Sequence, residues 1–124
     1  MEIVEQGIWA LGNIAGDCHK FRQMALEQNA LPVLVELLKT TTQENIFKHG
    51  IWALSNLTRG RPLPKFELIK DALPVFTEAL KHSKDPEILT DASWALYHLS
   101  DYDSPQIQVV LDTGVAPTIV QHLE

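Results

Sequence analysis

The sequence is poor in the features that mark secreted, membrane-bound and nucleic-acid-binding proteins. It has one cysteine, Cys18, in 124 residues, so no disulfide can form within the chain, and this suits a reducing compartment. No apolar run approaches the ~18 residues that a membrane-spanning helix requires. Lys and Arg number 10 against 16 Asp and Glu, a net charge of −6. This balance argues against direct nucleic-acid binding, because phosphate contacts need a basic face, and it favours a basic partner.

Signals for catalysis and for metal binding are also missing. Cys18 and His19 are neighbours, and adjacent residues rarely bring their side chains together, so this cysteine reads as a loop residue at a repeat boundary. No HExxH or CxxC spacing occurs, nor any glycine-rich phosphate loop. The five histidines of the chain show no paired metal-binding spacing; they are His19, His49, His82, His98 and His122. We therefore expect no enzyme activity, no cofactor and no bound metal.

One five-residue phrase recurs three times at nearly constant spacing. It begins at Trp9, Trp52 and Trp94, the three tryptophans of the chain, and reads WALGN, WALSN and WALYH. The tryptophans lie 43 and then 42 residues apart. A fixed period in the low forties is typical of stacked helical repeats. The sequence therefore predicts an all-α solenoid.

Each repeat is predicted to contain three helices over about 42 residues. After each phrase come a polar break, a short helix, and a proline that opens a second helix, since proline is tolerated in a first turn. The longer third helix contains the next phrase. The expected short helices are 21–28, 66–70 and 107–112; the second helices are 33–39, 75–82 and 118–123; the third helices are 2–15 and those starting near Gln43 and Pro86. The single segment 1–124 then divides into 1–16, the last helix of one repeat, full repeats at 17–60 and 61–103, and a partial repeat at 104–124.

Helical geometry predicts that the tryptophans face outward. A rotation of about 100° per residue gathers an apolar arc on the third helix. Its members are Ile46, Phe47, Gly50, Ala53, Leu54 and Leu57. Trp52 lies roughly 160° from the middle of that arc, on the polar side with Asn45, Lys48, Asn56 and Arg59. A repeated tryptophan usually fills a core, but a ladder of aromatic rings on a polar face is typical of a binding surface.

The chemistry of this ladder suits an extended basic peptide. An Asn side chain offers both a donor and an acceptor to a peptide main chain. Slots between indole rings would hold aliphatic stems that end in cations. Four carboxylates lie near the phrases at helical spacing: Glu5, Asp17, Asp91 and Asp101. Each alone reads as a solvated surface acid, but together they would select Lys or Arg tips through charge-assisted hydrogen bonds.

The stretches WALGNIAGD (9–17), WALSNLTRG (52–60) and LTDASWALYHLSD (89–101) resemble the armadillo repeats of importin-α, the adaptor that recognises nuclear localisation signals. The likeness covers nearly the whole chain, from the end of the family's third repeat into its sixth. It implies a right-handed superhelical solenoid whose concave groove binds Lys/Arg-rich signals in extended form. It also implies that Asp17 pairs with the most critical lysine of the signal. The other groove positions implied by the resemblance are Glu5, Gln6, Trp9, Asn13, Trp52 and Asn56.

Two features depart from that pattern. His98 stands where the other phrases have Asn and where the family commonly has Tyr, so this repeat is expected to mark the region between the family's two binding stretches. Lys48 and Arg59 add positive charge to the groove wall, which should weaken lysine binding nearby or favour acidic signal flanks. The family's preceding repeat, its minor groove and its basic importin-β-binding segment are absent from this sequence.

The resemblance implies a nuclear import adaptor that shuttles between cytoplasm and nucleus. For the full-length protein it implies importin-β and an export receptor as partners, besides basic cargo peptides. The alternative is a general armadillo or HEAT scaffold for another extended or helical protein partner. We also expect self-association through uncapped repeat ends, because a solenoid normally closes its ends with polar caps.

Overall fold

Helices make up most of residues 2–124, the part of the chain that the computed structural model describes. Met1, the first residue of the expected 1–16 segment, lies outside the described residues. The described part contains no β-strand, so the all-α prediction is confirmed. In chain order the helices are α1 (Glu2–Asp17), α2 (His19–Glu27), α3 (Ala30–Thr40), α4 (Glu44–Thr58), α5 (Phe66–Ile69) with a 3-10 turn η1 (Lys70–Ala72), α6 (Leu73–His82), α7 (Pro86–Leu99), α8 (Ser104–Asp112) and α9 (Val115–His122).

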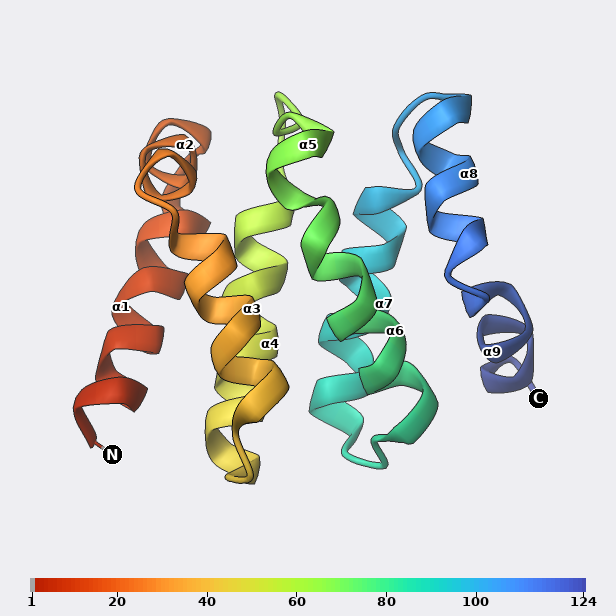
Figure 1. Ribbon diagram of the computed structural model, residues 1–124, viewed down its shortest axis with the longest axis horizontal. Helices are drawn as coiled ribbons and strands as arrows, with labels where there is room; N and C mark the ends of the chain where they lie inside the picture. Colours follow the sequence, from red (N-terminus) through yellow and green to blue (C-terminus); the bar gives the residue numbers. More distant parts are fainter. Residues whose placement is uncertain (1) are drawn as a thin grey trace.

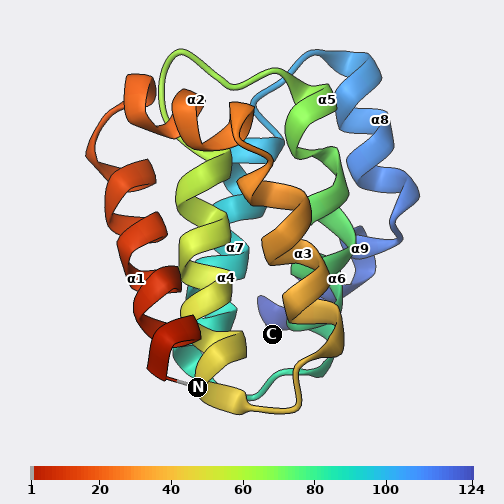
Figure 2. The ribbon, with the colours of Figure 1, turned by 60° about the vertical axis from the view of Figure 1, so that its left-hand side comes forward.

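The helices stack in a row, with the two termini at opposite ends of the molecule (Figure 1). The helices with the Trp phrases, α1, α4 and α7, lie side by side, and α4 packs against both of the others. Helices α3, α6 and α9 follow one another in a second layer, and the short helices α2, α5 and α8 lie near the top (Figure 2). Each repeat therefore contributes one long helix to each layer, as a solenoid requires.

The prolines lie in the first turn of each second helix, but the helices begin earlier than expected. Pro74 is the second residue of α6, while Pro32 and Pro117 are the third residues of α3 and α9. The first turn has no intrahelical partner for its N–H groups, so a proline costs no hydrogen bond at any of these positions. The short helix α8 likewise begins at Ser104, three residues before the predicted start, with Pro105 in its first turn.

Most residues of the apolar arc predicted for the third helix lie in the core of the molecule, and Phe47 is partly buried against it. Ile46 is 1% exposed, and Ala53, Leu54 and Leu57 are fully buried. Gly50 lets α3 approach closely, since a Cβ there would come within 2.2 Å of Leu38 Cδ2. Burying each large aliphatic side chain contributes about 1.5–3 kcal/mol, so this stripe is what holds successive repeats together.

The connector between α4 and α5 is tied down from both neighbouring repeats. Arg22 of α2 is 3% exposed and donates to the carbonyl oxygens of Arg59 and Pro62. Gly60 has a positive φ of 100°, and a Cβ there would lie 2.8 Å from Arg22 Nη1. From the other side, the Tyr102 hydroxyl donates to the Pro64 carbonyl. Burial lowers the pKa of Arg22 and raises that of Tyr102 to about 12.

None of the helices within 2–124 has the length and apolar character needed to cross a bilayer. In the same stretch, His, Cys, Asp and Glu side chains form no cluster of three or more that could hold a metal ion.

Candidate peptide-binding surface

The open side of α1, α4 and α7 presents the tryptophans, and we call it the tryptophan surface (Trp9, Trp52, Trp94 and the polar residues between them). Trp9 is 50% exposed and Trp94 is 57% exposed. Trp52, between them, is partly buried and packs against the core. The outward orientation expected for all three rings therefore describes Trp9 and Trp94 better than Trp52.

Trp52 is more buried because its ring lies on a glycine of the neighbouring repeat. A Cβ on Gly12 would come within 2.2 Å of Trp52 Cζ3, which is closer than any side chain could tolerate. Gly12 is the fourth residue of the first phrase, and Ser55 and Tyr97 occupy the same place in the other two. A glycine at this position thus lets the indole of the next repeat settle on the helix backbone.

Asn56 is buried, and both ends of its amide have partners within the chain. It is 6% exposed. Its Nδ2 donates to the Gly12 carbonyl at 2.9 Å, and its Oδ1 accepts from Arg59 Nε at 2.8 Å. Asn13, the same residue of the first phrase, is exposed on α1. The two asparagines therefore differ: Asn13 is accessible to a ligand, whereas Asn56 links α4 to α1 and to Arg59.

A hollow of about 420 Å³ lies between α4 and α7. We call it the second slot; its lining is Trp52, Ser55, Asn56, Arg59, Asp91, Trp94 and His98. His98 stacks on Trp94, with ring centroids 6.1 Å apart and planes at 25°. Burial, and next the charge of Arg59, lower the pKa of His98. Burial, and next Glu87, raise the pKa of Asp91. The slot thus combines two tryptophans with one acid and one arginine.

The region between α1 and α4, which we call the first slot, has a different composition. Glu5 lies 3.9 Å from His49 Nδ1, and the His49 ring meets Trp9 edge to face with centroids 5.1 Å apart. Gln6, Asn13 and Asp17 are exposed along α1. Glu5 and Asn13, each four residues from a half-exposed indole, and the carboxylate of Asp17 further along the helix are groups that a cationic side chain can use.

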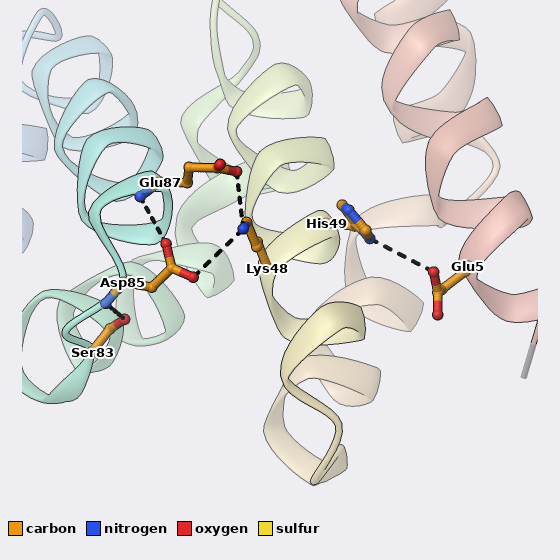
Figure 3. A network of polar contacts seen from close by, with 6 residues as sticks. All are labelled: Glu5, Lys48, His49, Ser83, Asp85 and Glu87. Carbon is orange, nitrogen blue, oxygen red and sulfur yellow. Dashed lines mark hydrogen bonds and ion pairs between the residues drawn. The ribbon is translucent and has the colours of Figure 1, made fainter.

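Lys48 has partners that the sequence did not reveal. Its ammonium lies 3.6 Å from an Asp85 oxygen and 3.2 Å from a Glu87 oxygen at the start of α7 (Figure 3). The hydrogen bond to Glu87 is the main cause that raises the pKa of Lys48. His49, the next residue, points the other way toward Glu5 (Figure 3). Two carboxylates therefore offset the charge of Lys48, which is not part of the lining of the second slot; the lining includes Arg59 instead.

Asp101 lies at the end of the surface, after α7. It is exposed and pairs with Arg61 of the α4–α5 connector. Both side chains are well hydrated, so this pair adds little stability. A basic ligand would have to compete with Arg61 for this carboxylate.

Sequence reasoning missed His49, Gly12 and Arg61 as parts of this surface. His49 is three residues before Trp52, the spacing that places two side chains on one helix face, so its position was available from the sequence. Gly12 and Arg61 act on residues about forty positions away along the chain, Trp52 and Asp101, and no local pattern reports such a pair.

Comparison with known proteins identifies the repeats. The Armadillo/beta-catenin-like repeat pattern matches residues 18–59 and 61–101. Importin subunit alpha-1b of Oryza sativa subsp. japonica is 43% identical over 98% of this chain, and importin subunit alpha-6 of Arabidopsis thaliana is 47% identical over 95%. The chain spans 23% and 22% of the lengths of these two relatives.

Solved structures give the same fold. A designed armadillo repeat protein in complex with the peptide (KR)4 superposes with a TM-score of 0.84 at 27% identity, over 98% of this chain and 50% of the designed one. A computationally designed armadillo repeat protein for modular peptide recognition gives 0.85 at 25% identity, over 99% and 51%. The chain therefore belongs to the Armadillo/beta-catenin-like repeat family, with importin-α subunits as relatives along nearly its whole length.

Proposed function

We propose that this segment binds extended Lys/Arg-rich peptides on its tryptophan surface, as part of a nuclear import adaptor. The observation that supports this most is the first slot, where half-exposed Trp9 lies about one helical turn from Glu5 and from Asn13, and Asp17 is exposed further along the same helix. Importin-α relatives and a designed armadillo protein solved with (KR)4 add support from outside the chain.

The spacing of the helices fits such a ligand. Packed helices lie roughly 8–10 Å apart, and an extended peptide advances about 3.3 Å per residue, so each repeat spans about three peptide residues. Alternate side chains of the peptide would enter the slots between indoles. Their aliphatic stems would lie on the rings and their cations would reach the carboxylates of Glu5, Asp17 and Asp91.

A fluorescence anisotropy titration tests the proposal. The probe is a labelled Lys-Lys-Lys-Arg-Lys peptide, and the matched control peptide has Gln in place of each basic residue. Binding of the basic peptide should weaken as salt rises, because the ion pairs lie at an open surface. Trp9→Ala should weaken binding roughly 5–30-fold, the usual effect of removing an aromatic anchor worth about 1–2 kcal/mol. Equal affinity for the two peptides would contradict the proposal.

One observation favours a second candidate, a scaffold whose partner has acidic residues. Arg59 lines the second slot and already bonds Asn56, so an acidic side chain would find a cation there. An acidic peptide of matched length in the same titration separates the candidates. Salt-sensitive binding of that peptide alone would favour the scaffold.

We further propose that the protein, like a full-length importin-α, moves between cytoplasm and nucleus. Its partners there would be importin-β and an export receptor. We propose no catalytic role, and the transport-adaptor names of the relatives support that view. A fluorescent fusion should accumulate in the nucleus when export is blocked, and an unchanged distribution would contradict the shuttling proposal.

A further inference from the structure

We propose, on the basis of the peptide-binding function above, that His49 makes the affinity of the first slot for basic peptides depend on pH. When protonated, its ring pairs with the Glu5 carboxylate that a peptide lysine or arginine would use. His49 is thus a residue that determines when this slot accepts a cation. The contact lies between α4 and α1, inside the row of helices.

His49 contacts both the aromatic and the acidic part of the first slot. Its ring meets Trp9 edge to face, with centroids 5.1 Å apart and planes at 83°. On the same ring, Nδ1 lies 3.9 Å from Glu5 Oε2 and is directed toward it from α4 to α1 (Figure 3). The side chains of His49 and Glu5 are 28% and 32% exposed. The two groups are therefore partly shielded from water, which strengthens any charge interaction between them.

The Nδ1 atom of His49 has an unused place for a hydrogen bond. It is buried, and none of the residues that the structure describes forms a hydrogen bond with it. Its distance of 3.9 Å from Glu5 exceeds the roughly 2.7–3.2 Å of an N–H···O bond. A neutral imidazole has a hydrogen on one nitrogen only, whereas a protonated one donates from both. Protonation therefore gives Nδ1 a hydrogen to donate to Glu5, after a shift of about 1 Å.

Glu5 is the carboxylate that a proton on His49 would attract. Lys48, the residue before His49, directs its ammonium the other way, to Asp85 and Glu87 of α7 (Figure 3). Among the side chains that the structure describes, those of α2, α3 and α7 form no ion pair with His49. The positive charge of a protonated ring would therefore be balanced by Glu5 on the neighbouring helix.

A protonated His49 opposes a basic ligand in two ways. It pairs with Glu5, so a cation of the peptide has to displace the imidazole in order to reach the carboxylate. It also places a positive charge against the Trp9 ring, where it repels a second cation. Histidine side chains change charge between about pH 5 and pH 8. The first slot should therefore accept basic peptides above this range, and peptide binding within it should release a proton.

The second slot also contains groups that titrate. Burial, and next the charge of Arg59, lower the pKa of His98, while burial, and next Glu87, raise that of Asp91. These groups would change the affinity for a basic peptide at acidic pH whatever His49 does. The contribution of His49 is therefore the difference between the natural chain and a His49 variant, because both proteins have the same second slot.

The anisotropy titration with the labelled Lys-Lys-Lys-Arg-Lys peptide, run at about pH 8 and pH 5.5 in constant salt, tests the proposal. From the higher to the lower pH, the affinity of the natural chain should fall roughly 2–5-fold more than that of His49→Gln, the effect of one partly exposed charge pair. Glu5→Gln is the second variant. It should bind more weakly than the natural chain at pH 8 and should lose less affinity on acidification, because the imidazolium then has no carboxylate to pair with.

His82→Gln is the matched control. His82 pairs with Glu78 at 3.1 Å on α6, in the other layer of helices, so this variant removes a histidine–glutamate pair away from the slot (Figure 2). Its affinity should follow that of the natural chain at both pH values. A loss of pH dependence in His82→Gln as large as in His49→Gln would contradict the assignment to the first slot.

A measurement without peptide tests the contact itself. The indole N–H signal of Trp9 in ¹H–¹⁵N NMR spectra, assigned by its absence in Trp9→Phe, should move between pH 8 and pH 5.5. It should move as far in His82→Gln and clearly less in His49→Gln.

The outcomes separate this proposal from the function on which it rests. Equal pH dependence of peptide affinity in the natural chain and His49→Gln would overturn the role of His49 while leaving peptide binding in place. A Trp9 signal that moves equally in both proteins would overturn it as well. Failure of the basic peptide to bind at either pH would instead overturn the proposed function, and this inference with it.

Discussion

The two slots of the tryptophan surface are built from the same sequence phrase, yet they offer different chemistry. In the first slot, Trp9 is half exposed beside Glu5 and His49, and Asn13 is accessible. In the second slot, Trp52 is partly buried and Asn56 is already bonded to Gly12 and Arg59. The first slot is thus open and acidic, while the second is partly filled by the chain itself.

This difference shows that a repeated motif does not imply a repeated function. The residues that distinguish the slots are Gly12 and Arg59, one of which lies inside a phrase and one just after it. Gly12 determines how deeply the next indole settles, and Arg59 determines whether the asparagine is available. A peptide that crosses both slots would therefore gain most of its binding energy in the first.

The largest expected effect comes from making Gly12 resemble Ser55. In Gly12→Ser the new Cβ overlaps the Trp52 ring, so the indole must move toward solvent. Trp94, which lies beside Ser55 rather than a glycine, is the more exposed ring. We expect a loss of about 1–3 kcal/mol in the free energy of unfolding, measured by urea titration. The control is Gly7→Ser, where space is open and the change should be neutral or slightly stabilising. Equal stability of the two variants would mean that the glycine does not seat the ring.

A smaller effect is expected from removing the two asparagines. Asn56→Ala deletes hydrogen bonds of 2.9 and 2.8 Å that tie α4 to Gly12 and Arg59, and should cost about 1–2 kcal/mol of unfolding free energy. Asn13→Ala, at an exposed position, should cost below about 0.5 kcal/mol but should weaken binding of the basic peptide. If Asn56→Ala weakened peptide binding more than Asn13→Ala did, without loss of stability, the contrast between the slots would be wrong.

Arg59→Gln should make the second slot more like the first. The variant removes a cation from the lining of Trp52, Asp91 and Trp94, so a basic peptide should bind about 2–5-fold more tightly, the size of an exposed charge interaction. Anisotropy at low and high salt measures the change. Lys81→Gln serves as the control because Lys81 is exposed on α6, in the other layer of helices, and does not line this slot. Unchanged or weaker binding in Arg59→Gln would show that the arginine does not repel the ligand.

The smallest effect is a pH dependence from His98. Burial and Arg59 lower its pKa in the folded state, so the unfolded chain takes up the proton first as pH falls. The contribution of His98 to stability is therefore present above the ordinary histidine value of about 6.5 and is lost below it. His98→Asn should lose less stability than the natural chain between neutral and mildly acidic pH, as followed by urea titration. Parallel curves for the two proteins would contradict the assignment.

The sequence predicted the architecture well because the architecture is periodic. The spacing of Trp9, Trp52 and Trp94 indicated stacked three-helix repeats, and rotation around α4 identified Ile46, Ala53, Leu54 and Leu57 as core. These are properties of one helix or one repeat, so a single stretch of sequence contains the information.

The states of Trp52, Asn56 and Lys48 could not be predicted in the same way. A helical wheel places all three on the polar side. The Trp52 indole, however, packs on Gly12 of α1, and the Asn56 amide donates to the Gly12 carbonyl. The Lys48 ammonium pairs with Asp85 and Glu87 at the start of α7. The decisive partners lie on neighbouring helices, roughly forty positions away along the chain. Burial of a polar-face residue depends on such partners, which periodicity does not describe.

The hydrogen bonds from Arg22 and Tyr102 to the α4–α5 connector have a consequence for how proteases would degrade the chain. Irregular segments with arginine are usually the first that trypsin cuts, because a protease must draw several residues into its cleft. Here Arg22 holds the backbone at Arg59 and Pro62 from one repeat, and Tyr102 holds Pro64 from the other. Trypsin does not cut before proline, so Arg61, which precedes Pro62, is not a cleavage site. Digestion at Arg59 thus requires two neighbours to release the segment, so this loop should resist nicking until the repeats separate.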